Sequence, residues 1–395
     1  MVIHKRRLSW SLYFNYFIHG FGLIILAQNM TSLATSWQTT IAVVSYVMSG
    51  VGIGRLIAYP VMGWLADRFS RKNFVYLGMI GYLLFAIGMI MTTNLVIAYG
   101  LAVIAGMANS ALDSGTYTTL VELNEGNGAG TVLIKAFMSA GEFVLPLIVV
   151  TLHDHQLWYG WSFILMAGLL VINWGNLIPL AFPPRQQITQ PASLGTERMV
   201  AQPQRRLVTS LLLAYGFTSM ALMIWFTQWI TLFAQRSLAF SAGLAHLLLS
   251  LYSIGSISGV LVLYWLLKRQ VAEQRLLGLL NAGAVGALML VSWGQHPVIV
   301  ALGSILFGFC AAGGVMQTGL TLFMKLYPQH RGLVTGLFYF CGSLASLAVP
   351  LITGWLSQTS IRRTFTANLV VALAGLCLTL GTFLLLQKWS RREEK

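Results

Sequence analysis

The chain has 395 residues, of which 57% are hydrophobic and 9% are charged, and its mean hydropathy is +0.75. Soluble proteins carry roughly a quarter of charged residues, so this composition excludes an ordinary soluble fold. The net charge of +14 would suit a nucleic-acid-binding protein, but the placement of the cations along the chain argues against nucleic acid as a partner.

Apolar segments of about twenty residues or more recur from one end of the chain to the other, each long enough to cross a bilayer as a helix. They are continuously apolar and do not alternate, which argues against strands. In chain order they span residues 9–30, 40–66, 73–93, 97–121, 131–152, 157–182, 207–234, 241–267, 274–294, 297–325, 332–357 and 364–387. We therefore predict an all-α, multi-pass membrane protein with twelve transmembrane helices.

The cations alternate between the two sides of the predicted membrane protein. Nineteen of the 24 Lys and Arg residues lie at the two termini and in every second loop, and only Arg236, Arg362 and Arg363 lie in the other loops. Cytoplasmic loops are enriched in Lys and Arg, so both termini are expected in the cytoplasm. The two remaining cations, Arg55 and Lys135, fall inside predicted helices.

A polar stretch divides the chain into two halves. Residues 183–206 (PPRQQITQPASLGTERMVAQPQRR) are rich in Pro, Gln and Arg, as expected of a linker. We predict a six-helix bundle over 1–182 and a second one over 207–395. A faint internal repeat agrees: DSG at 113–115 recurs 204 residues later as QTG, and PLI at 146–148 recurs at the same offset. Paired bundles of this kind are typical of secondary transporters.

The loop after the second predicted helix reads GWLADRFSRK, residues 63–72. It resembles the loop signature of the major facilitator superfamily, with serine in place of one glycine. The resemblance implies the fold of paired bundles and a role for this loop in closing the cytoplasmic gate. The residues that match and would form the gate motif are Gly63, Leu65, Asp67, Arg68, Arg71 and Lys72. The alternative is a solvated basic loop that only sets topology.

Several further segments resemble one branch of that superfamily, the inner-membrane transport proteins of the YdiM/YdiN type. They include LYFNYFIHG (12–20), GIGRL (52–56), AGMANSALDSGTY (105–117) and LIKAF (133–137). The likeness covers most of the chain. It implies a transport role in the bacterial inner membrane, and it implies no particular cargo.

Three ionisable residues fall deep inside predicted helices. Counting 1.5 Å per residue from the cytoplasmic end, Arg55 lies roughly 18 Å in, Glu142 roughly 16 Å and Asp113 roughly 13 Å. Charges inside the bilayer are expensive and face a cavity or a partner. We predict that the three form one buried network in which a carboxyl group, Asp113 before Glu142, loads and releases a proton. A static ion pair, or direct substrate binding by Arg55, are the alternatives.

Two local comparisons refine the prediction of a proton carrier. The stretch LDSGTY around Asp113 resembles the helix where fucose–proton symporters keep a glutamate. Glu142 departs from the YdiM/YdiN type, whose sequences look more like glutamine there. Lys135 lies only about one turn inside its helix, so it is expected to snorkel to the interface.

Polar side chains at helical spacing predict a substrate pocket. They lie on the first, fourth, seventh and tenth predicted helices, which line the cavity in the superfamily that the chain resembles. The candidate substrate-binding residues are Asn15, His19 and Asn29; Asn109 and Thr116; Trp225 and Gln228; and Gln317 and Thr321. The alternative for each is a hydrogen bond that holds two helices together. His19 is expected to make one such bond in the cavity wall and not to shuttle protons.

These patterns predict a monomeric secondary active transporter that moves a small polar solute, such as an organic acid or a sugar, by alternating access with protons. The lipid bilayer, protons and the solute are its expected partners. Proton-driven efflux of lipophilic compounds stays open, as does a non-transporting sensor or scaffold. The sequence carries no phosphate-binding loop, hydrolase motif or metal-ligand spacing, so neither an enzyme, a cofactor nor a metal site is expected.

Overall fold

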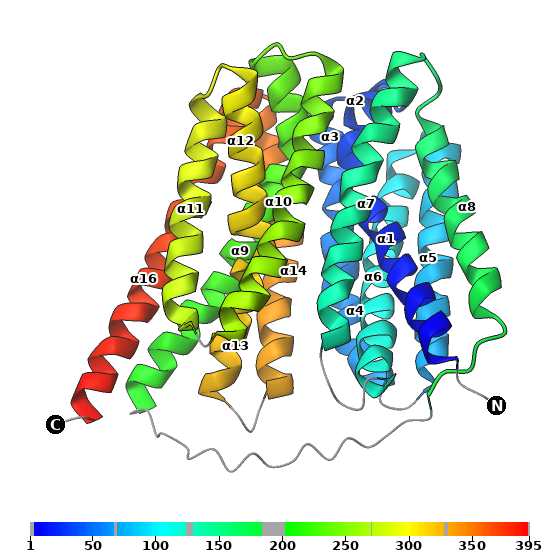
Figure 1. Cartoon of the computed structure of the whole chain (residues 1–395). Helices are drawn as coiled ribbons and strands as arrows, with labels where there is room; N and C mark the ends of the chain where they lie inside the picture. The colour runs from blue at the N-terminus through cyan, green and yellow to red at the C-terminus, as the bar shows by residue number, and fades with distance from the viewer. Residues whose placement is uncertain are drawn as a thin grey trace.

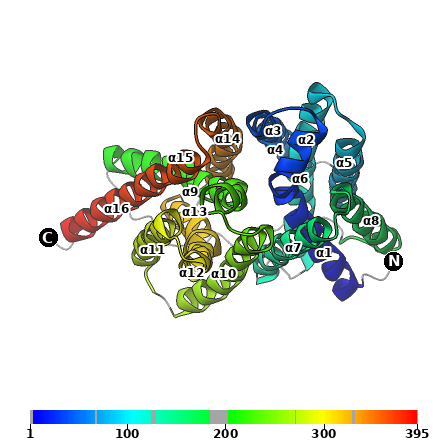
Figure 2. The same cartoon turned by 90° about the horizontal axis from the view of Figure 1, so that it is seen from above.

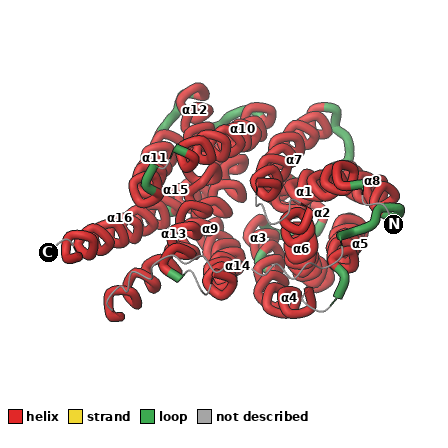
Figure 3. The backbone as a smooth tube through the Cα atoms, turned by 60° about the horizontal axis from the view of Figure 1, so that its bottom comes forward, coloured by secondary structure: helices red, strands yellow, loops and turns green. Residues whose placement is uncertain are grey.

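The structure is a computed structural model that describes residues 4–66, 69–123, 129–183, 202–269, 271–327 and 331–393. Every regular element in these ranges is a helix (Figure 3). Twelve helical spans among the described residues are long and apolar enough to cross a membrane. Their limits agree with the predicted segments to within a few residues, so the prediction of an all-α protein with twelve transmembrane helices is confirmed.

The helices form two bundles that stand side by side (Figures 1 and 2). The first bundle contains α1 (Lys5–Gln28), α2 (Met30–Ser36), α3 (Ile41–Met48), α4 (Gly50–Ala66), α5 (Arg71–Met91), α6 (Leu95–Leu123), α7 (Ala129–Asp154) and α8 (Gly160–Leu177). The start of α1 and the end of α16 lie at the same end of the molecule, here called the termini end; the other is the far end (Figure 1).

The second bundle repeats this plan. It contains α9 (Gln202–Ser237), α10 (Ala242–Lys268), α11 (Glu273–Trp293), α12 (Pro297–Phe307), the π-helix η1 (Gly308–Val315), α13 (Met316–Leu326), α14 (Arg331–Ser357), α15 (Ile361–Thr366) and α16 (Asn368–Glu393). Residues 184–201, most of the predicted linker, lie outside the described residues, so the exact division into domains stays a prediction.

Helix starts at the far end follow local sequence signals. Thr40 precedes α3 and its hydroxyl accepts a hydrogen bond from the Val43 amide at 3.4 Å. Ser360 does the same for the Arg363 amide at the start of α15. His296 caps α12, whose first residue is Pro297. Small polar residues before a helix satisfy amide groups that have no partner inside the helix, and proline at the first position needs none.

The tenth span is not one regular helix, although the sequence predicts a single segment over 297–325. It consists of α12, η1 and α13, and the π-helical part lies at mid-depth. Here the chain runs close to α10: a Cβ atom at Gly308 would collide with the carbonyl oxygen of Tyr252, and one at Gly313 would collide with Gly259. The wider π-helical turn accompanies this close approach, and such turns are frequent at functional sites.

Glycines bring the helices of the first bundle into backbone contact. A Cβ atom at Gly20 of α1 would collide with the carbonyl oxygen of Met138, and one at Gly141 of α7 with that of Phe17. The same reciprocal relation joins Gly54 of α4 to Gly106 of α6. Small residues that allow such approach are the usual means of packing helices in lipid. Neighbours of these glycines, among them His19, Glu142 and Arg55, are therefore held at fixed positions.

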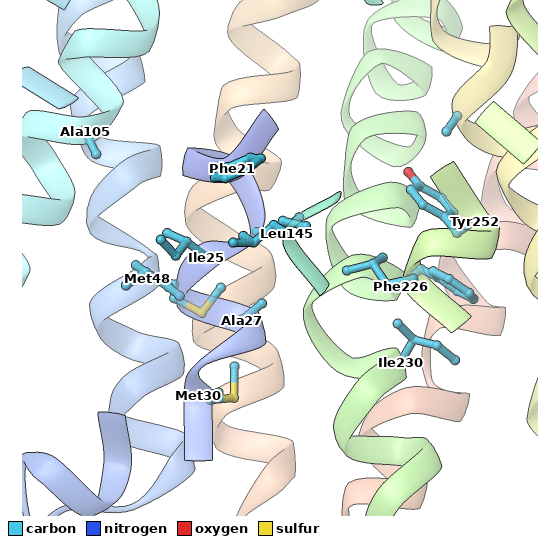
Figure 4. Close-up of a cluster of buried hydrophobic side chains, with 14 of the residues drawn as sticks. Phe21, Ile25, Ala27, Met30, Met48, Ala105, Leu145, Phe226, Ile230 and Tyr252 are labelled. Carbon is cyan, nitrogen blue, oxygen red and sulfur yellow. The ribbon is translucent and has the colours of Figure 1, made fainter. Parts of the chain in front are cut away.

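A hydrophobic cluster continues from one bundle into the other. Figure 4 shows Phe21 and Ile25 of α1 and Leu145 of α7 in the same cluster as Phe226 of α9 and Tyr252 of α10. All five side chains are almost fully buried. The two bundles therefore share one core where they meet, and they are not separated by lipid along this line.

We predict that the crossing of α4 and α6 tolerates no added side-chain atom. Gly106→Ala places a Cβ atom against the backbone of Val51, and overpacking of this kind costs about 1–3 kcal/mol. Gly100→Ala on the same helix meets nothing within 4 Å, so it is the matched control. Thermal unfolding of the purified proteins in detergent should show a lower midpoint for Gly106→Ala alone. Equal midpoints would contradict the close packing.

Candidate functional site

A cavity of about 200 Å³ lies at mid-depth between the two bundles. Side chains of α1, α3, α4, α6 and α7 line it on one side, and side chains of α9, α10, η1, α13 and α14 on the other. Its wall contains all three predicted buried charges, Arg55, Asp113 and Glu142, and it also contains Lys135. Four of the nine predicted substrate-binding residues line it as well: His19, Asn109, Gln228 and Gln317.

Asp113 of α6 is surrounded by neutral hydrogen-bond donors. The hydroxyl of Tyr16 donates to one carboxyl oxygen, and the hydroxyl of Tyr59 donates to the other at 2.6 Å. The side-chain amide of Asn109, one turn earlier on α6, lies 3.4 Å from that second oxygen. The three donors come from α1, α4 and α6, so this carboxyl group joins three helices of the first bundle.

His19 extends the same hydrogen-bond network. Its Nε2 lies 3.0 Å from the Asn109 amide nitrogen, and its Nδ1 lies 2.5 Å from the hydroxyl of Tyr82. An amide nitrogen only donates, so Nε2 accepts and Nδ1 carries the hydrogen that reaches Tyr82, which is the neutral imidazole. His19 thus makes two hydrogen bonds in the cavity wall, where the sequence predicted one. Asn109 connects it to Asp113.

Arg55 reaches across to the other bundle. Its Nη1 donates to the hydroxyl of Ser346 on α14 at 3.0 Å. Arg55 is 8% exposed, and its Nε has no hydrogen-bond partner. Gly52, one turn before Arg55 on α4, lies directly against the backbone at Leu347. This close approach of α4 and α14 explains how the short side chain of Ser346 comes within reach of Arg55.

Glu142 and Lys135 occupy α7, two turns apart. Glu142 is 4% exposed, and its carboxyl group accepts one hydrogen bond, from Ser139 at 3.4 Å. Ser139 also contacts Ser256 of α10 at 3.0 Å. Lys135 makes no hydrogen bond or ion pair within the described part of the chain and lines the cavity. The expectation that it only snorkels to the interface missed this position.

The predicted network of Arg55, Asp113 and Glu142 needs correction. The three side chains line one cavity, but no ion pair joins them in the described structure. Asp113 is satisfied by tyrosines, Arg55 by a serine of the other bundle and Glu142 by a serine of its own helix. Counting residues along each helix predicts their similar depth but not the rotation of each helix. The alternative, a static ion pair among the three, is likewise not formed in the described structure.

Five of the predicted substrate-binding residues do not line the cavity. Two asparagines, one in α1 and one directly after it, contact α8: Asn15 accepts from Asn173 at 2.7 Å, and Asn29 donates to Ser162 at 3.1 Å. These are contacts between helices, which was the alternative for each polar residue. Trp225 donates to the Thr364 carbonyl at 2.6 Å. Thr321 donates to the Gln317 carbonyl of its own helix, and Thr116 is buried within the bundle.

Sequence reasoning missed the tyrosines around Asp113. Tyr59 stands four residues after Arg55 and Tyr16 three residues before His19, so helical spacing placed each on the face of a residue already singled out. Their aromatic rings read as ordinary packing in apolar helices. What shows their role is the position of the hydroxyl groups, which depends on how three helices meet.

The gate motif is only partly visible. Asp67 and Arg68 lie outside the described residues, and Gly63 belongs to the last turn of α4. Arg71 lies 3.5 Å from Glu122 at the end of α6. Lys72 donates to the carbonyls of Ile178 and Leu180 after α8, both at 3.0 Å. These three contacts stay inside the first bundle, and the gate role remains a prediction.

Hydrogen bonds between the bundles lie at mid-depth and at the far end in the described part of the chain. Ser45 of α3 donates to the Pro350 carbonyl at 2.7 Å and accepts from Gln228 at 2.7 Å. Gln28 donates to Thr231 at 3.1 Å and contacts His246 at 2.6 Å. These contacts, together called the far-end seam, close the space between the bundles on the side away from the termini.

Comparison with known proteins agrees with this architecture. The Major Facilitator Superfamily model matches residues 12–350 and 233–394. The chain belongs to this superfamily. It is 39% identical over 373 residues to the inner membrane transport protein YdiM of Escherichia coli K12, a match that covers 94% of this chain and 92% of YdiM. It is 32% identical over 374 residues to YdiN of the same organism, with 94% and 89% covered. The resemblance seen in the sequence is therefore confirmed.

The fold is shared with solved transporters of low sequence identity. The crystal structure of a D-xylose–proton symporter superimposes with a TM-score of 0.78 at 11% identity, covering 95% of this chain and 96% of that one. At this identity the likeness concerns the fold alone. It confirms the two bundles of six transmembrane helices each.

We predict that the far-end seam can be trapped by a disulfide. The hydroxyls of Ser45 and Thr353 lie 3.4 Å apart, which is within reach of a cysteine pair. Ser45→Cys combined with Thr353→Cys should therefore cross-link under mild oxidation, in a background where Cys310, Cys341 and Cys377 are replaced by alanine. Maleimide labelling measures the remaining thiols, and each single variant is the control. Two thiols that stay free after oxidation would contradict the closed seam.

Proposed function

We propose that this protein is a secondary active transporter that moves a small polar solute across the bacterial inner membrane by alternating access, coupled to protons. The observation that carries the proposal is the cavity between the bundles, which contains four charged side chains and lies on the termini side of the far-end seam. Isolated charges at the middle of a bilayer are expensive, and a cavity for a polar solute and protons accounts for them. A sensor or scaffold has no need of them.

The relatives and the cation distribution support a location and an orientation. YdiM and YdiN are named inner membrane transport proteins. Lys and Arg concentrate at the two termini and in the loops on the same side of the membrane. This favours a cytoplasmic position for the termini end. With the seam closed at the far end, the described state is then the inward-facing one. Residues 1–182 and 207–395 act as the two rocking units, and the 63–72 motif closes the cytoplasmic side in the opposite state.

Asp113 is the proposed proton carrier. Its partners Tyr16 and Tyr59 bear hydroxyl groups, which donate to a carboxylate and accept from a protonated carboxyl group equally well. Asp113 can therefore gain or lose a proton without leaving a buried tyrosine hydroxyl with no hydrogen bond. Glu142 is the second candidate carrier, because it lines the cavity and the hydroxyl of its partner Ser139 has the same property.

The solute is proposed to contact the uncharged hydrogen-bonding groups of the wall. His19 and Asn109 present them from the first bundle, and Gln228 and Gln317 from the second. Gln228 also donates to Ser45 in the far-end seam. A solute bound to this glutamine would compete with the seam, which gives binding a direct route to opening it.

Efflux of lipophilic compounds is the second candidate function. One observation favours it: the second bundle lines the cavity with Met220, Met223 and Met316, and flexible methionines suit varied apolar ligands. The direction of transport separates the two candidates. A thermal-shift screen of sugars, organic acids, amino acids and lipophilic cations on the purified protein identifies a ligand. Its uptake into vesicles under an imposed proton gradient then decides. No gradient-driven movement of any stabilising ligand would overturn the transporter proposal.

We predict that Asp113→Asn separates transport from coupling. The amide keeps the size of the carboxyl group but carries no exchangeable charge, so accumulation against a gradient should fall by about tenfold or more while exchange of ligand across the membrane persists. Asp154→Asn is the matched control, because this carboxyl side chain is 61% exposed at the end of α7. Both activities are measured in vesicles with the ligand found in the screen. Full accumulation by Asp113→Asn would exclude Asp113 as the carrier.

A further inference from the structure

The two walls of the cavity differ in charge. All four charged lining residues belong to the first bundle: Arg55 on α4, Asp113 on α6, and Lys135 and Glu142 on α7. Among the described residues, those of the second bundle that line the cavity carry no formal charge. A ligand that fills the cavity therefore meets charges on one side and none on the other.

Arg55 and Lys135 keep hydrogen-bond donors that have no acceptor in the described structure. Arg55 is more than nine-tenths buried, uses Nη1 for Ser346 and leaves its buried Nε without a partner. A buried donor without an acceptor is destabilising, and more so when the group is charged. Lys135 makes no hydrogen bond or ion pair in the described structure. Both side chains line the same cavity, so an anion placed there would satisfy them.

The two carboxyl groups of the cavity take their hydrogen bonds from neutral groups and not from Arg55 or Lys135. Asp113 takes its hydrogen bonds from Tyr16, Tyr59 and Asn109, all neutral. Glu142 takes one from Ser139. No ion pair in the described part of the chain joins either carboxyl group to Arg55 or Lys135. The hydrogen-bond donors of the two cations are therefore available to a ligand.

The opposite wall suits an apolar or aromatic group. Met220 and Met223 of α9 and Met316 of α13 line it together with the rings of Tyr252 and Tyr339. Thioethers and aromatic rings pack well against other rings, and sulfur contacts with rings are favourable. Gln228 and Gln317 add amide groups at its edge.

We propose that the cavity binds an amphipathic organic anion, with its carboxylate at Arg55 and Lys135 and its apolar or aromatic body against the methionine and tyrosine side chains of the second bundle. This proposal rests on the proposed function only in taking the cavity as the transport site. It names the class of solute, and it unites the polar and the lipophilic character of the wall in one ligand.

The charge count of the wall links the anion to a proton. With both carboxyl groups ionised, the two cations and two carboxylates sum to zero, so a monoanion would leave the buried cavity with one negative charge. Protonation of one carboxyl group neutralises this extra negative charge. Around Asp113 stand Tyr16, Tyr59, Tyr117, Tyr339 and Arg55, and around Glu142 stand Lys135, Ser139 and Tyr252. The neutral imidazole of His19 lines the same wall and adds no charge to the count. Anion and proton therefore bind together, and anion affinity rises as pH falls.

Four matched probes test the ligand class by isothermal titration of the purified full-length protein at pH 6. Phenylacetate carries both features, phenylacetamide lacks the charge, phenethylamine reverses it, and acetate lacks the ring. Phenylacetate should bind at least about tenfold more tightly than each of the others. Its affinity should weaken by up to about tenfold per pH unit between pH 6 and 8, whereas that of phenylacetamide should not change. Equal or tighter binding of the amide or the amine, or no binding of phenylacetate, overturns the proposal.

Variants assign the anion to its two cations. Arg55→Gln and Lys135→Gln should each weaken phenylacetate binding by about tenfold or more and leave phenylacetamide binding unchanged. Lys135→Gln keeps the test valid if Arg55→Gln does not fold, because Lys135 makes no hydrogen bond or ion pair in the described structure that the substitution would remove. Arg236→Gln, at the exposed end of α9, is the control for a lost positive charge. Unchanged phenylacetate binding in folded Lys135→Gln would refute the assignment.

Binding and transport fail separately in this design. If phenylacetate binds with the expected pattern but no proton gradient drives its movement into vesicles, the ligand class stands and the proposed transport function falls. If a sugar is accumulated with protons while no carboxylate binds, the transport function stands and the anion proposal falls.

Discussion

Backbone contact between helices at glycine is the constraint on which the rest of this structure depends. Lipid gives neighbouring helices no hydrophobic gain on association, so close packing and hydrogen bonds must hold them. Gly20 with Gly141, and Gly54 with Gly106, bring α1 to α7 and α4 to α6 with no room for a side chain. Several cavity residues are sequence neighbours of these glycines. The crossings therefore fix the depth and direction of the charged groups, and the charges themselves need not hold the bundle together.

The internal repeat shows how one scaffold carries two chemistries. Asp113 and Gln317, the equivalent positions of the weak repeat in the sequence, both line the cavity. At the termini end, Arg71 of α5 pairs with Glu122 of α6, while Glu273 of α11 pairs with Lys325 of α13 at 2.5 Å. The ion pair occupies the equivalent place in the second bundle, but there the acidic residue comes from the earlier helix and the basic residue from the later one. Equivalent helices thus keep their contacts, and only the first bundle keeps charge in the cavity.

The helices and their order follow from the sequence, because runs of about twenty apolar residues have few other structures. Helix rotation does not follow. Asn109 and Asp113 share a face by their spacing of four, and the structure joins them. Asn15 and His19 share a face by the same rule, yet Asn15 turns to α8 and His19 to the cavity. An almost uniformly apolar helix has no polar face that fixes its rotation, so partners on other helices, such as Tyr59 beside Asp113, cannot be read from one segment.

The distribution of charge also bears on how the bundles could separate. The far-end seam consists of neutral hydrogen bonds, such as Ser45 to Pro350 and Gln28 to Thr231. Each is worth about 0.5–1.5 kcal/mol net, and water replaces it when the seam opens. Breaking a buried ion pair would cost about 3–5 kcal/mol. Arg55 to Ser346 is the charged crossing among the described residues. Its guanidinium also faces the cavity, so a bound anion would compete for the group that holds α4 to α14, and occupancy would loosen the contact that opening must break.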